Sequence, residues 1–431
     1  MIMKTKVNSM HRIMLNTVGI IFLLVGGTFA QNKAGYINPE EHKILTSDRA
    51  DGRFLSTRGF IHHKMKNLTP RLEFNENFNE MEYLAWQNKV RVKLNQLMNF
   101  PLSNSQPTPK LLSTNERTGY TVQKWEMYPE SGSVVTFLML VPNGVSASNP
   151  APAVICFPGS NRTKENLAGE PELNPNYSRD SFNEENKMAK YYAEQGIIAI
   201  ALDNPGIGEA SDLESFGLGP NYDRNTFSRF LIDMGWHYLG LSAFNGQKVF
   251  DWLKTLDMVD PVRISLSGHS LGTEPVMVLA VLNPDIKAVV FNDFLTNTIR
   301  RMVSQTKPNS SGLRPVANWL GHSVPGMWKW FDYADLLASI APTHLLITEG
   351  GVTIDLNTIE KAYSIMNIPD NFDYWYYKKY SNPDDRKVIE NMPEGLDMNE
   401  FFEYANVDAP NHYFKHDIAV PWLSNILLND E

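Results

Sequence analysis

The pentapeptide Gly268-His-Ser-Leu-Gly272 constrains this chain more than any other stretch of its sequence. Ser270 can act as a nucleophile only if a very tight turn pushes its hydroxyl out at the end of a strand, and a side chain at either glycine would obstruct that turn. Residues 262–267 alternate between apolar and polar, as a strand does, and residues 275–282 form an apolar run of helix length. The sequence therefore predicts a strand, a nucleophile elbow and a helix, with Ser270 as a catalytic serine.

Apolar runs along the rest of the chain predict an α/β fold. Strands at 120–128 and 133–141, joined by a turn that contains proline and glycine, predict an antiparallel hairpin at one end of a sheet. Strands then alternate with helices, which implies a mostly parallel central sheet with right-handed crossovers and flanking helices. We expect these strands at 152–157, 197–202, 288–291, 343–348 and 372–378, and these helices at 182–195, 236–256, 275–282 and 357–366, followed by a terminal helix that ends at Leu428.

The same pattern predicts the organisation of the chain. Residues 31–110 are expected to be an N-terminal extension with one helix, at 80–100, and residues 111–431 a catalytic domain. Two segments of this domain are too long for simple connections: a cap over the active site at about 293–340, and a second insertion at about 380–410. The cap carries the aromatic residues Trp319, Trp328, Trp330 and Phe331. These rings could contact the substrate, or form a small core of the cap itself.

Residues 1–30 have the features of a secretory signal peptide. Basic residues precede an apolar run at 13–25, and small residues follow at 26–30, where a signal peptidase would cut. We expect a mature protein that begins near Gln31, is secreted or periplasmic, and has no stable membrane insertion. A retained anchor is the alternative, but the apolar run is short for a span and contains Asn16.

Charge and composition exclude several other functions. The formal net charge is -9 and no block of Lys or Arg is present, which argues against a nucleic-acid partner.

The single cysteine, Cys156, lies in an apolar strand and is expected in the core. The adjacent His62 and His63 lack further ligands at suitable spacing, and no phosphate loop or dinucleotide motif occurs, so neither a metal nor a cofactor is expected. The oligomeric state does not follow from the sequence.

The histidine that activates Ser270 should follow it in the chain, after the acid. Only His322, His344, His412 and His416 come later. His322 falls in the expected cap and His344 in a strand, while His416 is placed like the first residue of the terminal helix. We therefore predict His412 as the general base.

The acid should follow the strand at 343–348. Glu349 stands directly at its end and Asp355 lies on the next loop, where it could equally cap a helix, so both stay open. Asp293, after the preceding strand, is a third possibility. The oxyanion would be held by the backbone N–H groups of Leu271 and of Ser160, which follows the strand at 152–157.

With Gly268-His-Ser-Leu-Gly272, the Phe157-Pro-Gly159 loop and the late histidine, the chain from about Tyr120 onward resembles the α/β-hydrolases of the dienelactone-hydrolase and acetyl-xylan-esterase type. The resemblance implies a secreted serine hydrolase that cleaves carboxylic esters through an acyl-enzyme, without a cofactor, on acyl or methyl ester decorations of polysaccharides. A serine peptidase or amidase of the same fold is the alternative. A non-catalytic binding protein is disfavoured, because nucleophile, acids and histidine all occur in the expected order.

Overall fold

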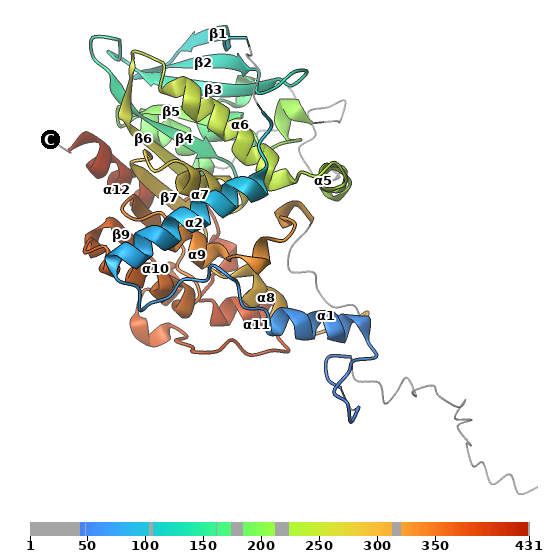
Figure 1. The fold of residues 1–431 in the computed structure, drawn as a ribbon. Helices are drawn as coiled ribbons and strands as arrows, with labels where there is room; N and C mark the ends of the chain where they lie inside the picture. Colours follow the sequence, from blue (N-terminus) through green and yellow to red (C-terminus); the bar gives the residue numbers. More distant parts are fainter. Residues whose placement is uncertain are drawn as a thin grey trace, which may run out of the picture. The chain divides into compact units, whose positions relative to one another are not determined.

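The computed structural model describes residues 44–47, 49–102, 107–160, 162–173, 184–211, 224–312 and 320–429 (Figure 1). The chain divides into two units, residues 1–61 and residues 62–431. Within the first unit, the described residues end in the first half of helix α1 (Thr57–Lys66). The predicted signal peptide, residues 1–30, lies outside the described residues. All of the architecture below belongs to the second unit.

A nine-stranded sheet forms the centre of this unit, with the order β1-β2-β3-β5-β4-β6-β7-β8-β9. β1, β2, β3 and β5 are antiparallel neighbours, and all pairs from β5 to β9 are parallel. The predicted fold class, a mostly parallel sheet flanked by helices, is confirmed. The strands are β1 (Lys110–Glu116), β2 (Tyr120–Met127), β3 (Val135–Pro142), β4 (Ala151–Phe157), β5 (Ile198–Leu202), β6 (Val259–His269), β7 (Ala288–Asn292), β8 (His344–Ile347) and β9 (Phe372–Tyr374).

Helices cover both faces of the sheet, because the central strands are apolar on both sides. In β4, Ala153, Ile155 and Phe157 face one hydrophobic core, while Val154 and Cys156 face the other. The helices on the first face are α2 (Glu80–Met98), α6 (Tyr238–Leu253), α7 (Thr273–Leu282), α9 (Tyr333–Ala338) and α10 (Thr353–Ile365). Those on the second face are α3 (Lys164–Ala168), α4 (Met188–Ala193) and α12 (His416–Leu428). The other helices are α5 (Arg224–Asp233), α8 (Thr298–Ser304) and α11 (Met398–Tyr404).

The N-terminal region differs from the expectation in one respect. The described residues between 31 and 110 contain two helices, whereas one was expected, because α1, which includes His62 and His63, forms in addition to α2. The predicted helix at 80–100 is present as α2. Asn79 and Glu82 form a capping box at its start, and Asn99 ends it in a left-handed conformation.

α2 belongs to the main hydrophobic core. Its buried side chains, which include Tyr83, Trp86 and Val90, join the core that covers the first face of the sheet. Figure 1 shows α2 crossing α7, with which it is in contact. The domain boundary at 110 and 111 stays a prediction.

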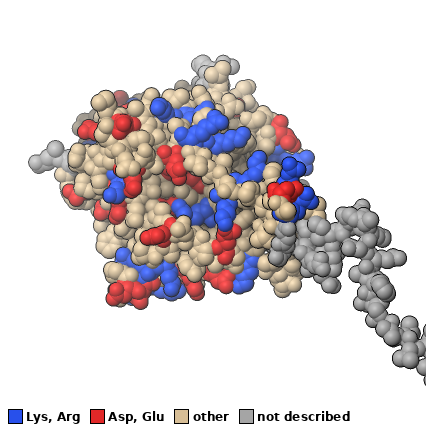
Figure 2. All heavy atoms as spheres, turned by 60° about the horizontal axis from the view of Figure 1, so that its bottom comes forward, with Lys and Arg blue, Asp and Glu red and all other residues tan. Residues whose placement is uncertain are grey.

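β1 was not predicted, because its residues are almost all exposed and show no apolar face. Basic and acidic side chains both occur on the face in Figure 2, and neither sign covers it. No helix among the described residues combines the length and the apolar character needed to cross a bilayer.

Candidate active site

Ser270 lies at the end of β6, in the tight turn that the sequence predicted. Its φ is 52°, a left-handed conformation that is strained for a serine. A Cβ on Gly268 would lie 2.4 Å from the carbonyl oxygen of Gly272, and a Cβ on Gly272 would lie 2.3 Å from that of Phe157. Both glycines are therefore required by backbone atoms that cannot move away. The turn exposes Ser270 at the carboxyl end of the parallel strands.

The loop after β4 packs directly against this turn. A Cβ on Gly159 would lie 2.9 Å from Nδ1 of His269 and 3.5 Å from Cβ of Ser270. The side-chain amide of Asn204, after β5, donates to the carbonyl oxygens of Pro158 and Gly159 at 3.0 Å each. The loop is thus fixed by a buried residue, and Ser160 faces the same pocket as Ser270 and Leu271.

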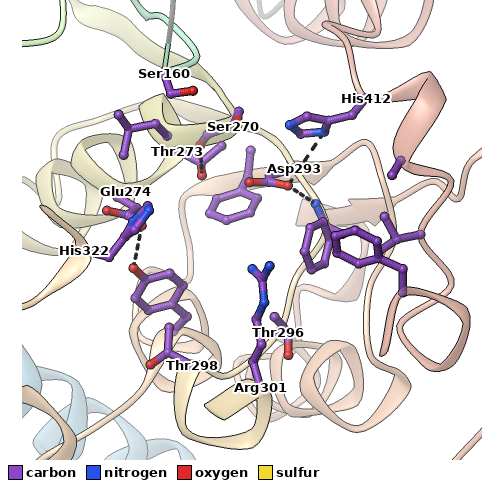
Figure 3. A pocket seen from close by; sticks show the side chains of 17 residues that line it. Ser160, Ser270, Thr273, Glu274, Asp293, Thr296, Thr298, Arg301, His322 and His412 are labelled. Carbon is purple, nitrogen blue, oxygen red and sulfur yellow. Dashed lines mark hydrogen bonds and ion pairs between the residues drawn. The ribbon is translucent and has the colours of Figure 1, made fainter. Parts of the chain in front are cut away.

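His412 and Glu349 form the second part of the site. Nδ1 of His412 donates to Oε2 of Glu349 at 2.6 Å, and the carboxylate is fully buried. Tyr377 donates its hydroxyl to the same oxygen at 2.7 Å, and the Lys415 ammonium donates to Oε1 at 2.7 Å. The imidazole can therefore present only Nε2 to the pocket, which Ser270 and His412 both line (Figure 3).

These contacts shift the pKa of both groups. Burial lowers the pKa of His412, but the hydrogen bond to Glu349 and the charge of Asp293 outweigh it and raise that pKa to about 9. Burial raises the pKa of Glu349, whereas the hydrogen bond to His412 and the charges of His412 and Lys415 lower it, with a net decrease. Glu349 is therefore an ionised carboxylate that stabilises a positive charge on His412.

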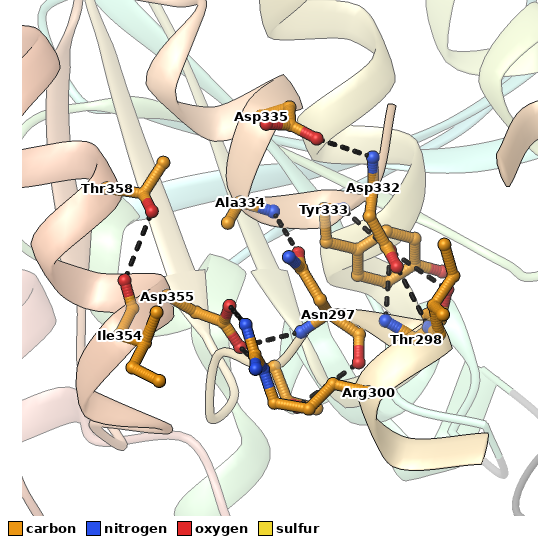
Figure 4. A network of polar contacts seen from close by, with 12 residues as sticks. Asn297, Thr298, Arg300, Asp332, Tyr333, Ala334, Asp335, Ile354, Asp355 and Thr358 are labelled. Atoms are coloured by element: carbon orange, nitrogen blue, oxygen red, sulfur yellow. Dashed lines mark hydrogen bonds and ion pairs between the residues drawn. The ribbon is translucent and has the colours of Figure 1, made fainter. Parts of the chain in front are cut away.

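The other two acid candidates occupy different positions. Asp355 does not contact His412. It accepts the N–H of Asn297 at 2.9 Å and pairs with Arg300 at 3.1 Å, which ties α10 to the start of α8 (Figure 4). Asp293 does lie near the imidazole, with Oδ1 4.0 Å from Nδ1 of His412, and burial raises the pKa of its carboxyl to about 6.

Both insertions contribute to the pocket, which has a volume of about 330 Å³. The first supplies residues between 293 and 333, and the second supplies Phe402, Val407 and Ala409. The second insertion also has a small core of its own around α11. The polar lining groups are those labelled in Figure 3: Ser160, Ser270, Thr273, Glu274, Asp293, Thr296, Thr298, Arg301, His322 and His412.

Of the aromatic residues for which substrate stacking or a core of the cap was left open, Trp328, Trp330 and Phe331 are not in the lining of this pocket. Trp330 lies between Lys93 and Arg71, whose charged groups are 4.1 Å and 5.1 Å from its ring centroid. Trp328 donates its indole N–H to Thr298 at 2.7 Å. Phe331 is fully buried in the main core, and Trp319 lies outside the described residues. The aromatic lining consists instead of Phe291, Phe294, Tyr333 and Phe402.

Several residues of the site could not be predicted from the sequence. Lys415 and Tyr377 hold Glu349, and no local motif marks either of them. His322 was set aside as a cap residue, but its Nδ1 bonds to Glu274, which also accepts the Tyr333 hydroxyl at 2.8 Å. His416, by contrast, opens α12 as expected, with its ring stacked on Tyr191 at 4.7 Å.

One group of residues has the donor atoms for a metal ion. Among the described residues, Asp293, Glu349 and His412 bring three such atoms within 4.8 Å of one another. However, both oxygens of Glu349 already accept hydrogen bonds, one of them from the Lys415 ammonium. A cation already neutralises this carboxylate, so the donor set does not fit a metal.

Comparison with known proteins agrees with the observed fold. A model of the Abhydrolase family matches residues 36–425. A crystal structure from Bacteroides fragilis, of a protein provisionally assigned as an acetyl xylan esterase, is 43% identical, with 91% of this chain and 100% of that chain covered and a TM-score of 0.85. A methylesterase is 15% identical, with 88% and 74% covered and a TM-score of 0.51, which shows the shared fold alone. None of the curated proteins compared with the sequence matches it.

Proposed function

Since this chain belongs to the Abhydrolase family, we propose that it is a serine esterase that cleaves carboxylic esters through a Ser270–His412–Glu349 triad. The hydrogen bond between Nδ1 of His412 and the buried Glu349 carries the proposal, because it directs Nε2 toward the pocket that Ser270 faces. A serine hydroxyl needs such a base at neutral pH, and the base needs a carboxylate to fix its tautomer.

The reaction then proceeds in two steps. Nε2 of His412 takes the Ser270 proton as Oγ attacks the ester carbonyl, and the resulting imidazolium is stabilised by Glu349. The N–H groups of Leu271 and Ser160 hold the oxyanion, and the imidazolium gives its proton to the departing alcohol. A water molecule, deprotonated by His412, hydrolyses the acyl-enzyme and restores Ser270.

For the substrate we propose an acyl or methyl ester decoration of a polysaccharide or its oligosaccharides. Two observations support this class. The Bacteroides fragilis relative carries an assignment as an acetyl xylan esterase, and the pocket combines aromatic side chains with several polar groups, as sugar sites do. Export through residues 1–30 would bring the enzyme to such polymers.

Two carboxylate variants test the triad. Glu349→Gln should lower kcat/KM on a chromogenic acetate ester by about 10³-fold or more, because the tautomer and the charge that support His412 are lost. Asp355→Asn should keep kcat/KM within a few-fold of wild type, although it weakens the pair with Arg300. Steady-state kinetics on the purified variants measures both.

Controls separate chemistry from folding. Ser270→Ala should abolish turnover and labelling by a fluorophosphonate, with an unchanged circular dichroism spectrum. Full activity of either Ser270→Ala or Glu349→Gln would refute the triad. Release of a peptide amide at a rate comparable to the acetate ester would favour an amidase instead.

A further inference from the structure

Arg301 places a cation inside the pocket, and no described carboxylate forms a salt bridge with it. Its guanidinium points into the hollow that Ser270 and His412 line (Figure 3). Nε of Arg301 is buried without a hydrogen-bond partner, and among the described residues no carboxylate forms an ion pair with this side chain. A buried donor of a charged group without a partner is costly, so such a group in a native structure requires an explanation.

Arg300, the preceding residue on α8, has a structural role and serves as a comparison. Arg300 forms hydrogen bonds through Nη2 and Nε to Asp355, which is itself almost fully buried. Its guanidinium fork is therefore occupied within the protein. Helix α8 thus carries one arginine that is used for the fold and one whose fork is left for another group.

Aromatic rings hold the Arg301 guanidinium in place. Its central carbon lies 5.6 Å from the ring centroids of Phe294 and Phe401 and 5.8 Å from that of Phe402. Such rings stabilise the cation and limit its movement without using its N–H donors. The guanidinium is thereby positioned in advance for a ligand.

The acidic side chains of the pocket do not form hydrogen bonds with Arg301. Glu274 is bonded to His322 and accepts the Tyr333 hydroxyl. Asp293 accepts the N–H of Phe294 at 2.8 Å and lies beside His412. Both acids hydrogen-bond to other groups, and Asp293 acts on Arg301 through its charge without a hydrogen bond. Among the described residues, no acid therefore occupies the N–H donors of Arg301.

We infer that Arg301 binds a carboxylate of the substrate, so that the ester cleaved at Ser270 belongs to a molecule with a uronic acid unit. A planar guanidinium fork matches the two oxygens of a carboxylate, and a single fork can hold such a group in one orientation. Phe294, Phe402 and Tyr333 line the same pocket and can contact a sugar ring. The inference rests on the proposed function and specifies its substrate.

A matched pair of esters tests it: mono-O-acetylated methyl glucuronoside and the corresponding methyl glucoside, with acetate release as the measurement. The wild type should prefer the acidic ester by about 30-fold in kcat/KM, the effect of one charge-assisted bidentate contact. Arg301→Gln should remove this preference, because only the acidic ester carries the carboxylate that the guanidinium binds. Arg301→Lys, which keeps the charge but loses the fork, should retain part of the preference.

Arg300→Gln is the control, because it removes an arginine of the same helix that points elsewhere. It should lower stability but keep the preference for the acidic ester. No preference in the wild type, or an equal loss on both esters in Arg301→Gln, would overturn the inference.

Calorimetry with the Ser270→Ala protein separates this inference from the proposed function. D-glucuronate should bind at least tenfold more tightly than D-glucose, and Arg301→Gln should abolish the difference. If neither ester is cleaved but this Arg301-dependent difference is found, the proposed esterase activity fails, whereas the assignment of Arg301 as a carboxylate-binding residue stands. Equal binding of glucose 6-sulfate and glucuronate would overturn the assignment of a carboxylate.

Discussion

At the scale of single residues, His412 is controlled by two carboxylates with different positions. Glu349 bonds to Nδ1 at 2.6 Å, and Asp293 lies 4.0 Å from the same atom without a hydrogen bond. The charge of Asp293 therefore affects the pKa of His412 but does not orient its ring. His269 stacks beside His412, with ring centroids 4.9 Å apart, and burial lowers the pKa of His269 to about 3, so it adds no positive charge.

This arrangement predicts an alkaline pH profile. His412 can accept the Ser270 proton only when neutral, and its pKa is raised to about 9. In the wild type, kcat/KM should therefore be low at neutral pH, fall further as pH decreases, and rise through a midpoint near pH 9. Asp293→Asn removes a negative charge and should lower that midpoint by roughly one pH unit. Initial rates between pH 6 and 10, corrected with Ser270→Ala, measure the shift.

Asp417 provides a control for a general loss of charge. This carboxylate is exposed at the start of α12, five residues after His412 in the sequence. Asp417→Asn should leave the midpoint unchanged. A midpoint that does not move in Asp293→Asn would show that Asp293 does not act on His412.

At the scale of elements, buried aspartates join the helices beneath the pocket. Asp332 accepts the N–H groups of Thr298 and Ile299 at the start of α8 and that of Tyr333 at the start of α9, at 2.8–2.9 Å (Figure 4). Asp335 completes the capping box of α9 and accepts the N–H of Phe74. One carboxylate thus serves two helix starts, and α8 is the helix that carries Arg301.

Loss of the Asp332 carboxylate should destabilise the whole protein. Asp332→Ala leaves several buried N–H donors without a partner and should lower the free energy of unfolding by about 3 kcal/mol or more. Asp332→Asn keeps one acceptor oxygen and should cost less, about 1–2 kcal/mol. Urea unfolding followed by circular dichroism measures both changes. Substitution of the exposed Asp370 by alanine should have little effect, and an equally small effect at Asp332 would contradict this account.

At the scale of the whole molecule, α2 is part of the catalytic body rather than an accessory helix. The Tyr83 hydroxyl donates to the carbonyl oxygen of Ala338 at 2.7 Å. The Gln87 amide donates to Ser339 at 2.8 Å and to Ala341 at 2.6 Å, just before β8. These bonds connect the N-terminal region to the segment that leads to Glu349.

Truncation should therefore have opposite effects at two positions. A protein that lacks residues 1–30 should fold and hydrolyse the acetate ester at the full rate, and exported protein should begin near Gln31 on N-terminal sequencing. A protein that begins at Pro107 lacks α2 and should be insoluble or inactive, because a large apolar surface on α7 and α10 would be exposed. Exported protein that begins at Met1, or a stable enzyme without α2, would contradict these expectations.

The elbow and most of the sheet could be predicted from the sequence alone, and His412 as the general base stays a prediction. The elbow depends on steric limits that the two glycines of the pentapeptide already reveal. β4 and β5 are continuous apolar runs, which are typical of central strands that are buried on both faces. The N-terminal helix α2 was visible from its apolar period and its end at Pro101. Exposed β1 carries no such pattern, and its place in the sheet depends on pairing with β2. Short α1 likewise shows no apolar period that would have predicted it.

Which side chains meet in the pocket depends on the packing of segments that lie far apart in the chain. Glu349 and Asp355 follow the same strand and have similar chemistry, but only Glu349 contacts His412, which is 63 positions further along the chain. The same holds for Arg300 and Arg301, which are adjacent in sequence yet point to a buried aspartate and to the pocket. A local pattern specifies the conformation of its own segment, whereas a side chain's partner is set by the packing of distant segments.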